Sequence, residues 1–257
     1  MTALVTGATA GIGHAFAQLL AAEGDRLVLV ARDEARLGAV AEELRAAGAA
    51  EVEVLPADLS TDAGCQAVRD RLADAEDAVD LLVNNAGFGL NQPFIGGDLA
   101  AEERMLDVLV RATLRLTHAA LPGMVERGRG HVINVSSVAS WFPTGTYAAA
   151  KAWVTTFTEG LAGELAGTGV TVTAVCPGFT HTEFHARAEM QMGALPGWTW
   201  LDARRVASDG LAAARAGRTV SVPSTRYHAL VLAAQYTPRP LLRRATALVP
   251  RTRRTRG

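Results

Sequence analysis

The sequence is poor in lysine, cysteine and aromatic residues. Lys151 is the only lysine, although lysine and arginine together number 25, and aromatic residues make up 5% of the 257 residues. Cys65 and Cys176 are too few and too far apart to indicate a disulfide framework, which fits a reducing compartment. No basic segment followed by a long apolar one opens the chain, so we expect neither a signal peptide nor a membrane span, and a cytoplasmic location.

Neither sign of charge is in excess, because the formal net charge is −1 and charged residues make up 20% of the chain. This balance gives no electrostatic basis for binding nucleic acid. The exception is residues 238–257, where arginine is frequent and no acidic residue occurs. We expect these residues to form a solvated basic tail, with contact to a membrane surface as the alternative.

Short runs rich in valine and leucine alternate with longer helical patterns. The short runs predict seven strands, at Ala3–Thr6, Arg26–Ala31, Glu51–Leu55, Val79–Asn84, His131–Ser136, Val170–Val175 and Thr219–Val222. The longer patterns predict helices, among them Ile12–Ala22, Glu34–Ala47, Glu102–Glu126 and Ala148–Leu165. This order is typical of an α/β fold, here a single Rossmann-type domain with a doubly wound parallel sheet and helices on both faces.

We assign residues 1–237 to this one domain, which the chain length allows. The alternation breaks at Phe184–Leu201, a segment with two methionines and two tryptophans. We interpret it as a lid over the substrate near residues 183–201; a packed surface helix is the alternative.

Tyr147 precedes the single lysine by four positions, with three alanines between them. Alanine favours helix, and residues i and i+4 lie on one face of a helix about one turn apart. A cation beside a phenol favours the phenolate, so we expect Lys151 to lower the pKa of Tyr147 toward the range useful to a general acid or base. The alternative is a Tyr/Lys pair on a helix surface, because short motifs often match by chance.

A glycine-rich turn follows the first predicted strand and leads into the first predicted helix. Its sequence is Thr6-Gly7-Ala8-Thr9-Ala10-Gly11-Ile12-Gly13. Glycine permits a tight turn and close approach of the backbone to a pyrophosphate, and the N–H groups at a helix start attract negative charge. At this junction the turn predicts a dinucleotide site.

The second predicted strand ends in Ala31 and Arg32, where dinucleotide folds distinguish a ribose hydroxyl from a 2′-phosphate. A carboxylate at this tip would favour the hydroxyl, whereas arginine can bind a phosphate with two hydrogen bonds. The tip therefore favours NADP(H) over NAD(H). Asp33 is the counter-argument, although it is also suited to cap the next helix.

Three more motifs follow in order on the predicted elements: Asn84-Asn85-Ala86-Gly87, Ser136-Ser137 and Tyr147 with Lys151. Together with the glycine turn, they make the chain resemble the short-chain dehydrogenase/reductase family over Thr2 to about Val222. In particular it is similar to bacterial ketone and 3-oxoacyl reductases.

The resemblance implies a catalytic group of Ser137, Tyr147 and Lys151. Tyr147 would be the general acid or base at the substrate oxygen, and Ser137 would hydrogen-bond the same oxygen, with Ser136 as the alternative. Lys151 would lower the pKa of the phenol and bind the nicotinamide ribose.

The resemblance also implies which residues bind the cofactor. They are Thr6, Gly7, Thr9, Gly11, Ile12, Gly13, Arg32, Asp58, Leu59, Asn85, Ala86, Gly87, Tyr147, Lys151, Pro177, Gly178, Thr180 and Thr182. The first six would hold the pyrophosphate, Arg32 the 2′-phosphate, and the segment Pro177–Thr182 the carboxamide.

Two departures from the family pattern stand out. Leu109 occupies the place where many members have an asparagine that supports a proton relay to the lysine, and an apolar side chain cannot hold that water. Ser137 and Tyr147 are ten positions apart, fewer than is common, so the loop Val138–Thr146 is expected to be tight and to shape the substrate pocket.

The sequence therefore predicts an oxidoreductase that transfers a hydride between NADP(H) and an apolar carbonyl or alcohol substrate. A non-catalytic NADP(H) sensor or scaffold of the same fold is the alternative. We expect no metal site, because His181 and His185 lack an evident third ligand. By family analogy, helices that carry Leu114, Leu121, Trp153 and Phe157 pair across a two-fold axis, so a homodimer or homotetramer is expected.

Overall fold

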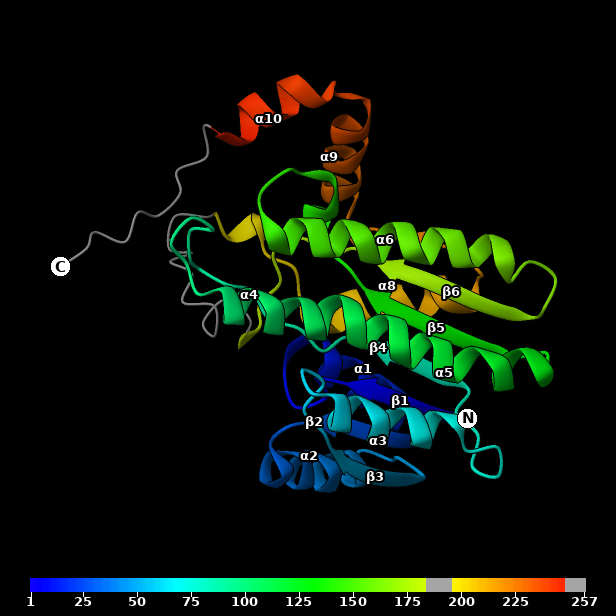
Figure 1. Cartoon of the computed structure of the whole chain (residues 1–257). Helices are drawn as coiled ribbons and strands as arrows, with labels where there is room; N and C mark the ends of the chain where they lie inside the picture. The colour runs from blue at the N-terminus through cyan, green and yellow to red at the C-terminus, as the bar shows by residue number, and fades with distance from the viewer. Residues whose placement is uncertain (184–195, 248–257) are drawn as a thin grey trace.

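The computed structural model describes residues 1–183 and 196–247. Seven strands form one parallel sheet in the order β3-β2-β1-β4-β5-β6-β7 (Figure 1). Their bounds are β1 Thr2–Thr6, β2 Arg26–Ala31, β3 Glu51–Pro56, β4 Leu81–Asn84, β5 Gly130–Val135, β6 Val170–Val175 and β7 Val220–Ser221. The predicted doubly wound sheet is confirmed, and each predicted strand overlaps an observed one.

Helices cover both faces of the sheet. One layer comprises α1 Gly11–Ala22, α2 Glu34–Ala46 and α8 Ala203–Arg215; the other comprises α3 Asp62–Ala73, α5 Thr113–Glu126 and α6 Thr146–Glu164 (Figure 1). The remaining helical elements are α4 Leu99–Leu106, η1 Asp107–Ala112, η2 Val138–Trp141, η3 Gly197–Thr199, α9 Thr225–Tyr236 and α10 Arg239–Ala247.

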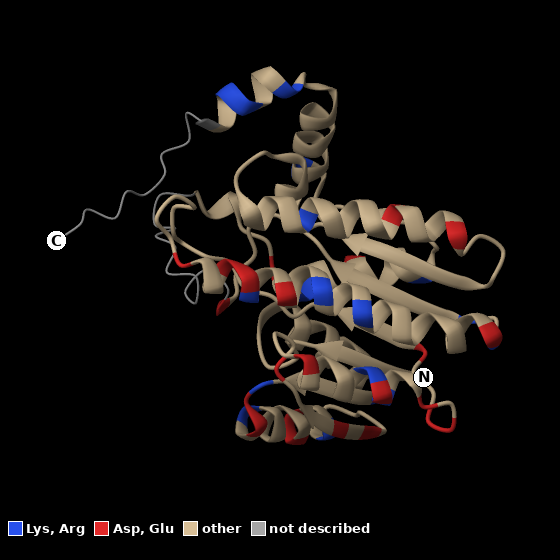
Figure 2. Ribbon diagram, in the orientation of Figure 1, with Lys and Arg blue, Asp and Glu red and all other residues tan. Residues whose placement is uncertain are grey.

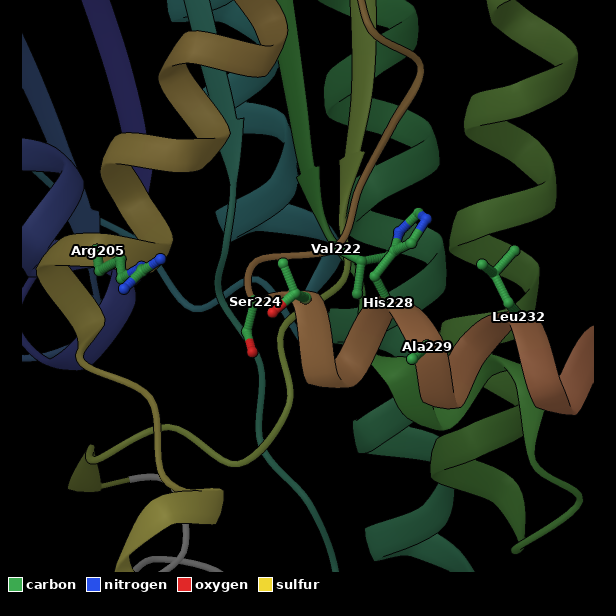
Figure 3. A pocket seen from close by; sticks show the side chains of 7 residues that line it. Arg205, Val222, Ser224, His228, Ala229 and Leu232 are labelled. Atoms are coloured by element: carbon green, nitrogen blue, oxygen red, sulfur yellow. The ribbon is translucent and has the colours of Figure 1, made fainter.

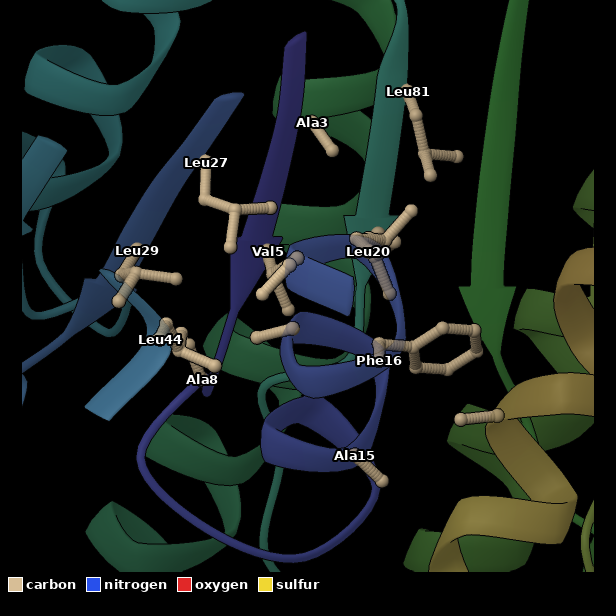
Figure 4. Packing of buried hydrophobic residues seen from close by; sticks show 14 of the residues in the cluster. Ala3, Val5, Ala8, Ala15, Phe16, Leu20, Leu27, Leu29, Leu44 and Leu81 are labelled. Atoms are coloured by element: carbon tan, nitrogen blue, oxygen red, sulfur yellow. The ribbon is translucent and has the colours of Figure 1, made fainter. Parts of the chain in front are cut away.

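Side chains of successive residues in the central strands pack on opposite faces of the sheet. Val5 of β1 belongs to the core under α1 and α2, where Phe16 and Leu20 also pack (Figure 4). Leu4 belongs to the core under α3 and α5. Side chains alternate across a strand, so a strand buried on both faces must be apolar at every position. This is why the central strands read as continuous apolar runs.

Among the described residues, side chains cap four α-helices at their N-termini. Asp33 accepts a hydrogen bond from Arg36 N–H at the start of α2, as its position beside Arg32 predicted. Thr61, Asp98 and Asp202 do the same for α3, α4 and α8. At the start of α1, by contrast, Ala10 offers no capping side chain and the first turn holds no acidic residue. The N–H groups of that turn are left for another acceptor.

The predicted single helix Glu102–Glu126 is wrong in one respect. The helix begins at Leu99, and Asp107–Ala112 forms a π-helical turn between α4 and α5. A π turn adds a residue per turn and is common at functional sites. The spacing of apolar residues in the sequence does not indicate the π turn, because the flanking helical turns keep the ordinary spacing.

Part of the predicted basic tail is helical, and most of its described side chains are exposed to solvent. Arg239–Ala247 forms α10, in which Leu242 is buried while Leu241 is 54% exposed. Figure 2 shows basic residues and no acidic ones on this helix. The buried Leu242 lies among exposed arginines, and the arginines obscure this pattern in the composition. In the part of the chain that the structure describes, no helix is long and apolar enough to cross a membrane.

Candidate active site

The candidate site begins where the strand order reverses, between β1 and β4. The chain runs outward from β1 to β2 and β3, then returns to place β4 beside β1. The hydroxyl of Thr6 joins the two strands: it donates to Val83 O at 3.1 Å and accepts from the N–H groups of Asn85 and Ala86 at 2.9 and 3.0 Å. In open parallel sheets ligands bind at such a switch point, outside the carboxyl ends of the strands.

The glycines of the turn have no room for side chains. A Cβ on Gly13 would lie 2.3 Å from both Gly7 O and Asn85 Nδ2, and one on Gly7 would lie 2.9 Å from the same amide nitrogen. Asn85 Nδ2 donates to Thr6 O at 2.9 Å and to Gly7 O at 3.3 Å, so its amide holds the turn in place. Gly7 and Gly11 have φ of 66° and 58°, which favours glycine.

These features fit a dinucleotide. The uncapped N-terminus of α1 follows the turn directly, so its N–H groups can serve as donors to a pyrophosphate. Thr9 and Ile12 are partly buried in the turn, and the Thr182 side chain covers Gly11, where an added Cβ would lie 2.8 Å from Thr182 Cγ2. The structure thus brings the first and last predicted cofactor segments together.

The tips of β2 and β3 lie beside this junction, at the same carboxyl edge of the parallel sheet. Arg32 is exposed just past β2. Burial raises the pKa of Asp58, but hydrogen bonds from Ser60 and the charge of Arg32 outweigh it, so the pKa lies below its usual value. The carboxylate is therefore charged and near Arg32. Leu59 is buried in the core.

Sequence reasoning missed a second arginine here. Arg36, in the first turn of α2, donates to both carboxylate oxygens of Glu183, at 2.5 and 3.1 Å. The two residues are 147 positions apart, so no local pattern indicates the pair. The pairing links the cofactor end of α2 to the segment that leaves β6. Residues 184–195 of the predicted lid, His185 among them, lie outside the described residues, whereas residues 196–201 are described and include η3.

Ser137, Tyr147 and Lys151 lie together at the carboxyl end of β5 and the start of α6. Ser137 hydrogen-bonds the Tyr147 hydroxyl, and the Lys151 Nζ lies 5.8 Å from the centre of the Tyr147 ring. Lys151 is buried, and its Nζ donates to Val135 O at 2.7 Å. The helix α6 confirms that Tyr147 and Lys151 share one helical face.

The proton affinities differ from the expectation that the lysine lowers the pKa of the phenol. Burial raises the pKa of Tyr147 to about 12, and only the hydrogen bond from Ser137 opposes it. Burial also lowers the pKa of Lys151 to about 8. The reason is that both groups are desolvated and the ammonium points to Val135 O rather than to the phenol oxygen.

The two serines have different surroundings. The Ser136 hydroxyl is buried, donates to Lys151 O at 2.9 Å and pairs with Thr155 Oγ1 at 2.7 Å. Ser137 is partly exposed, and its side chain accepts from Ala139 N–H at 3.1 Å as it starts η2. The geometry therefore favours Ser137 over Ser136 as the serine that faces a substrate. The short η2 turn occupies the first four positions after Ser137 in the interval to Tyr147.

Leu109 lies in the π-helical turn and faces the same region. A Cβ on Gly87 would lie 2.6 Å from Leu109 Cδ2 and 4.0 Å from Lys151 Nζ, so the leucine and the lysine flank one glycine. Leu109 is buried in a small apolar cluster against which Tyr147 and Phe88 pack. The side chain expected to replace the relay asparagine is thus beside the lysine and is apolar.

The segment after β6 lies beside the turn that follows Ser137. Pro177 O accepts from Val138 N–H at 3.0 Å, which ties the segment to the turn that follows Ser137. Thr180 is buried and donates to Gly178 O at 3.0 Å. His181 stacks on Trp200 with ring centres 4.6 Å apart. The predicted residues Pro177, Gly178, Thr180 and Thr182 therefore lie in one segment that hydrogen bonds hold near Ser137.

A separate groove of about 330 Å³ lies between α8 and α9 (Figure 3). Its lining consists of Arg205, Val222, Ser224, Thr225, His228, Ala229 and Leu232. This lining includes none of the predicted catalytic or cofactor residues, so the groove is distinct from the cleft described above. No group of three or more potential metal ligands occurs among residues 1–183 and 196–247.

Comparison with known proteins decides the family, since residues 1–193 match the short chain dehydrogenase family. The chain belongs to this family. It is 42% identical over 186 residues to sulfoacetaldehyde reductase 2 of Chromohalobacter salexigens, covering 70% of this chain and 73% of that protein. A short-chain dehydrogenase from Sphingobium yanoikuyae, in complex with NADPH, is 35% identical with a TM-score of 0.83, over 91% of this chain and 93% of that one.

A second solved structure, the bulky-bulky ketone specific alcohol dehydrogenase from Comamonas testosteroni, is 28% identical with a TM-score of 0.78. That match covers 100% of this chain and 96% of the other. The short-chain dehydrogenase described here is therefore an NAD(P)-dependent oxidoreductase with a Rossmann-type fold. The predicted family, fold class and enzyme class are confirmed.

Proposed function

We propose that this short-chain dehydrogenase reduces bulky apolar ketones or oxidises the matching alcohols, with NADP(H) as its cofactor. The observation that carries the proposal is the group formed by Ser137, Tyr147 and Lys151 beside a glycine turn that fits a dinucleotide. When bound, the nicotinamide would supply or accept the hydride.

In reduction, Tyr147 gives its hydroxyl proton to the substrate oxygen, and Ser137 donates a hydrogen bond to the same oxygen. With a pKa of about 12, the phenol is fully protonated near neutral pH and ready to act as the acid. Lys151 then stabilises the phenolate that forms, because its ammonium lies on the same face of α6. Thr6 and Asn85 act indirectly, since their polar groups hold the glycine turn.

The choice of NADP(H) is supported by Arg32, which is exposed at the tip of β2 while Asp33 is used as the cap of α2. This role as a helix cap supports a structural reading of Asp33. The similar Sphingobium yanoikuyae structure contains NADPH, which agrees with this choice.

An apolar substrate is supported by the walls of the site. Phe88 and Leu90 pack against the same buried cluster as Tyr147, and the rings of Phe179 and Trp200, near the segment after β6, have centres 6.1 Å apart. Such surfaces favour hydrophobic groups on both sides of a carbonyl. The Comamonas testosteroni relative is named for bulky-bulky ketones, in line with this proposal.

The experiment follows NADPH and NADH oxidation with a panel of bulky ketones, aldehydes and 3-oxoacyl thioesters, for the parent and for Tyr147→Phe. We expect NADPH-dependent turnover that falls by about 10²–10⁴-fold in the variant, because the proton donor is gone. NADPH binding should persist. Unchanged turnover in Tyr147→Phe would contradict the assigned acid, and tight binding without turnover on any substrate would favour the sensor.

The cofactor assignment has its own test in Arg32→Ala. We expect a rise of about 10–100-fold in the KM for NADPH, the value of a charge-assisted phosphate contact, and little change for NADH. Arg69→Ala, on the surface of α3, is the control and should change neither. An equal effect of Arg32→Ala on both cofactors would refute the phosphate contact.

We also propose that the enzyme is a cytoplasmic homo-oligomer. Both cysteines are free and buried, which supports a reducing compartment. The small-molecule substrate follows from the family. Contact of the basic C-terminal segment with a membrane surface stays a prediction.

A further inference from the structure

Tyr227 lies in the first turn of α9, beyond the residues 1–193 that match the family. Its ring covers Gly178, because a Cβ on that glycine would lie 2.0 Å from Tyr227 Cζ. Its hydroxyl accepts a hydrogen bond from Phe179 N–H at 3.1 Å and donates one to Thr199 O at 2.7 Å. One side chain therefore holds both the segment that leaves β6 and the segment that leads into α8.

The two segments are also bonded to each other. Leu201 N–H donates to Phe179 O at 2.7 Å, and His181 N–H donates to Leu201 O at 3.0 Å. The neighbouring Arg226 donates to Trp198 O at 2.5 Å, and its guanidinium lies 5.7 Å from the Trp198 ring. Two successive residues at the start of α9, Arg226 and Tyr227, are thus hydrogen-bonded to the segment that leads into α8.

The contact of Tyr227 with Gly178 and Phe179 lies in a segment predicted to bind the cofactor. Gly178 and Phe179 belong to the segment Pro177–Thr182, which reaches the glycine turn through the Thr182 side chain over Gly11. At its other end, Pro177 O is bonded to the backbone that follows Ser137. A shift of Gly178 would therefore displace the wall at the nicotinamide end of the cleft. Arg32, at the far end, has no part in this contact.

We propose that Tyr227 is a positioning residue that fixes the segment Pro177–Thr182 against the nicotinamide end of the cofactor. The inference rests on the proposed function, because it assumes that the segment faces the ring. Tyr227 fixes the segment in two ways. Its ring prevents Gly178 from moving toward α9, and its hydroxyl, bonded to both Phe179 N–H and Thr199 O, fixes the position of Phe179 relative to Thr199. The C-terminal part of the chain thereby completes a site whose reacting groups all lie before residue 194.

The test compares two ligands that share the adenine end of the cofactor. NADPH spans the cleft, whereas adenosine 2′,5′-bisphosphate carries the adenosine and the 2′-phosphate and has no nicotinamide. Dissociation constants for both are measured by calorimetry on the full chain, for the parent, Tyr227→Phe and Tyr236→Phe. Tyr236 lies on the same helix and is 84% exposed, so its variant is a matched control.

We expect Tyr227→Phe to weaken NADPH binding about tenfold and to leave the bisphosphate within twofold of the parent, because only the hydroxyl bonds at the nicotinamide end are lost. Gly178→Ala should produce the same selective loss through the clash with the Tyr227 ring. Tyr236→Phe should match the parent for both ligands.

Two results would overturn the inference while the proposed function stands: NADPH binding in Tyr227→Phe equal to that of the parent, or an equal loss for both ligands. The latter would mean a general loss of structure rather than a local one. A parent that binds neither NADPH nor NADH would instead refute the proposed cofactor site, and this inference with it.

Discussion

Lys151 is a cation that the fold buries at a cost. A pKa of about 8, against an ordinary value of 10.5, means that burial disfavours the charged form by about 3 kcal/mol. Its hydrogen bond to Val135 O offsets only part of this cost. The chain retains the lysine because its charge is useful beside a phenolate, which is a function that a buried apolar residue cannot supply.

This cost predicts the behaviour of Lys151→Met. The variant should lose turnover but gain about 1–2 kcal/mol in free energy of unfolding at pH 7, because an apolar side chain of similar length needs no desolvation. The pKa of the folded state lies below that of the unfolded state, so the penalty is fully present below about pH 8 and is released as pH rises toward 10.5. The gain should therefore shrink over that range.

Urea denaturation of parent and variant at pH 7 and pH 10 measures this difference. A variant that is less stable than the parent at pH 7, or a difference independent of pH, would show that Lys151 is not a strained cation in the folded protein. Loss of turnover alone would not distinguish these cases.

At the scale of elements, β1, the glycine turn and α1 act as one unit. The unit depends on backbone contacts that leave no space at Gly13, where an added Cβ would lie 2.3 Å from Gly7 O. Asn85 after β4 completes it by bonding Thr6 and Gly7. The predicted anion site therefore requires α1 to pack closely against the glycine turn.

A pair of identical substitutions tests this condition. Gly13→Ala should destabilise the protein by more than 2 kcal/mol and abolish NADPH binding, because a backbone atom rather than a flexible side chain meets the new Cβ. Gly38→Ala, in α2, has no atom within 4 Å of its new Cβ and should stabilise by about 0.5–1 kcal/mol through helix propensity. Urea denaturation and calorimetry with NADPH measure both effects. Normal NADPH binding by Gly13→Ala would refute the close contact.

The sequence indicates the elements better than it indicates their irregularities. All seven strands and the capping role of Asp33 follow from local pattern and residue chemistry. The π turn that carries Leu109 and the helix α10 do not, because the first changes hydrogen bonding without changing composition and the second has its leucines among arginines.

At the scale of the whole molecule, α4 and α5 expose two leucines on the surface of one helical layer. Leu106 is 40% and Leu114 is 43% exposed, and Trp153 and Phe157 stack on the neighbouring α6 with ring centres 4.7 Å apart. Figure 1 shows α5 and α6 side by side on one face of the sheet. Exposed apolar side chains on adjoining helices are typical of a surface that another subunit covers.

We expect a homodimer or homotetramer that Leu114→Arg dissociates to smaller species, because a charge would be buried at the interface. Light scattering coupled to size-exclusion chromatography measures the mass. Leu230→Arg, at a leucine of α9 that is 44% exposed, is the control and should keep the mass of the parent. A parent that elutes as a monomer would refute the predicted assembly.

From the sequence alone follow the fold class, the glycine turn and the pairing of Tyr147 with Lys151, because each depends on spacing within a strand, a turn or a helix. Only the tertiary structure decides that Ser137 rather than Ser136 faces the phenol, that burial raises the pKa of Tyr147 instead of the lysine lowering it, and that Tyr227 holds Gly178. These three features depend on burial and on contacts between residues far apart in the chain, and a local sequence pattern specifies neither.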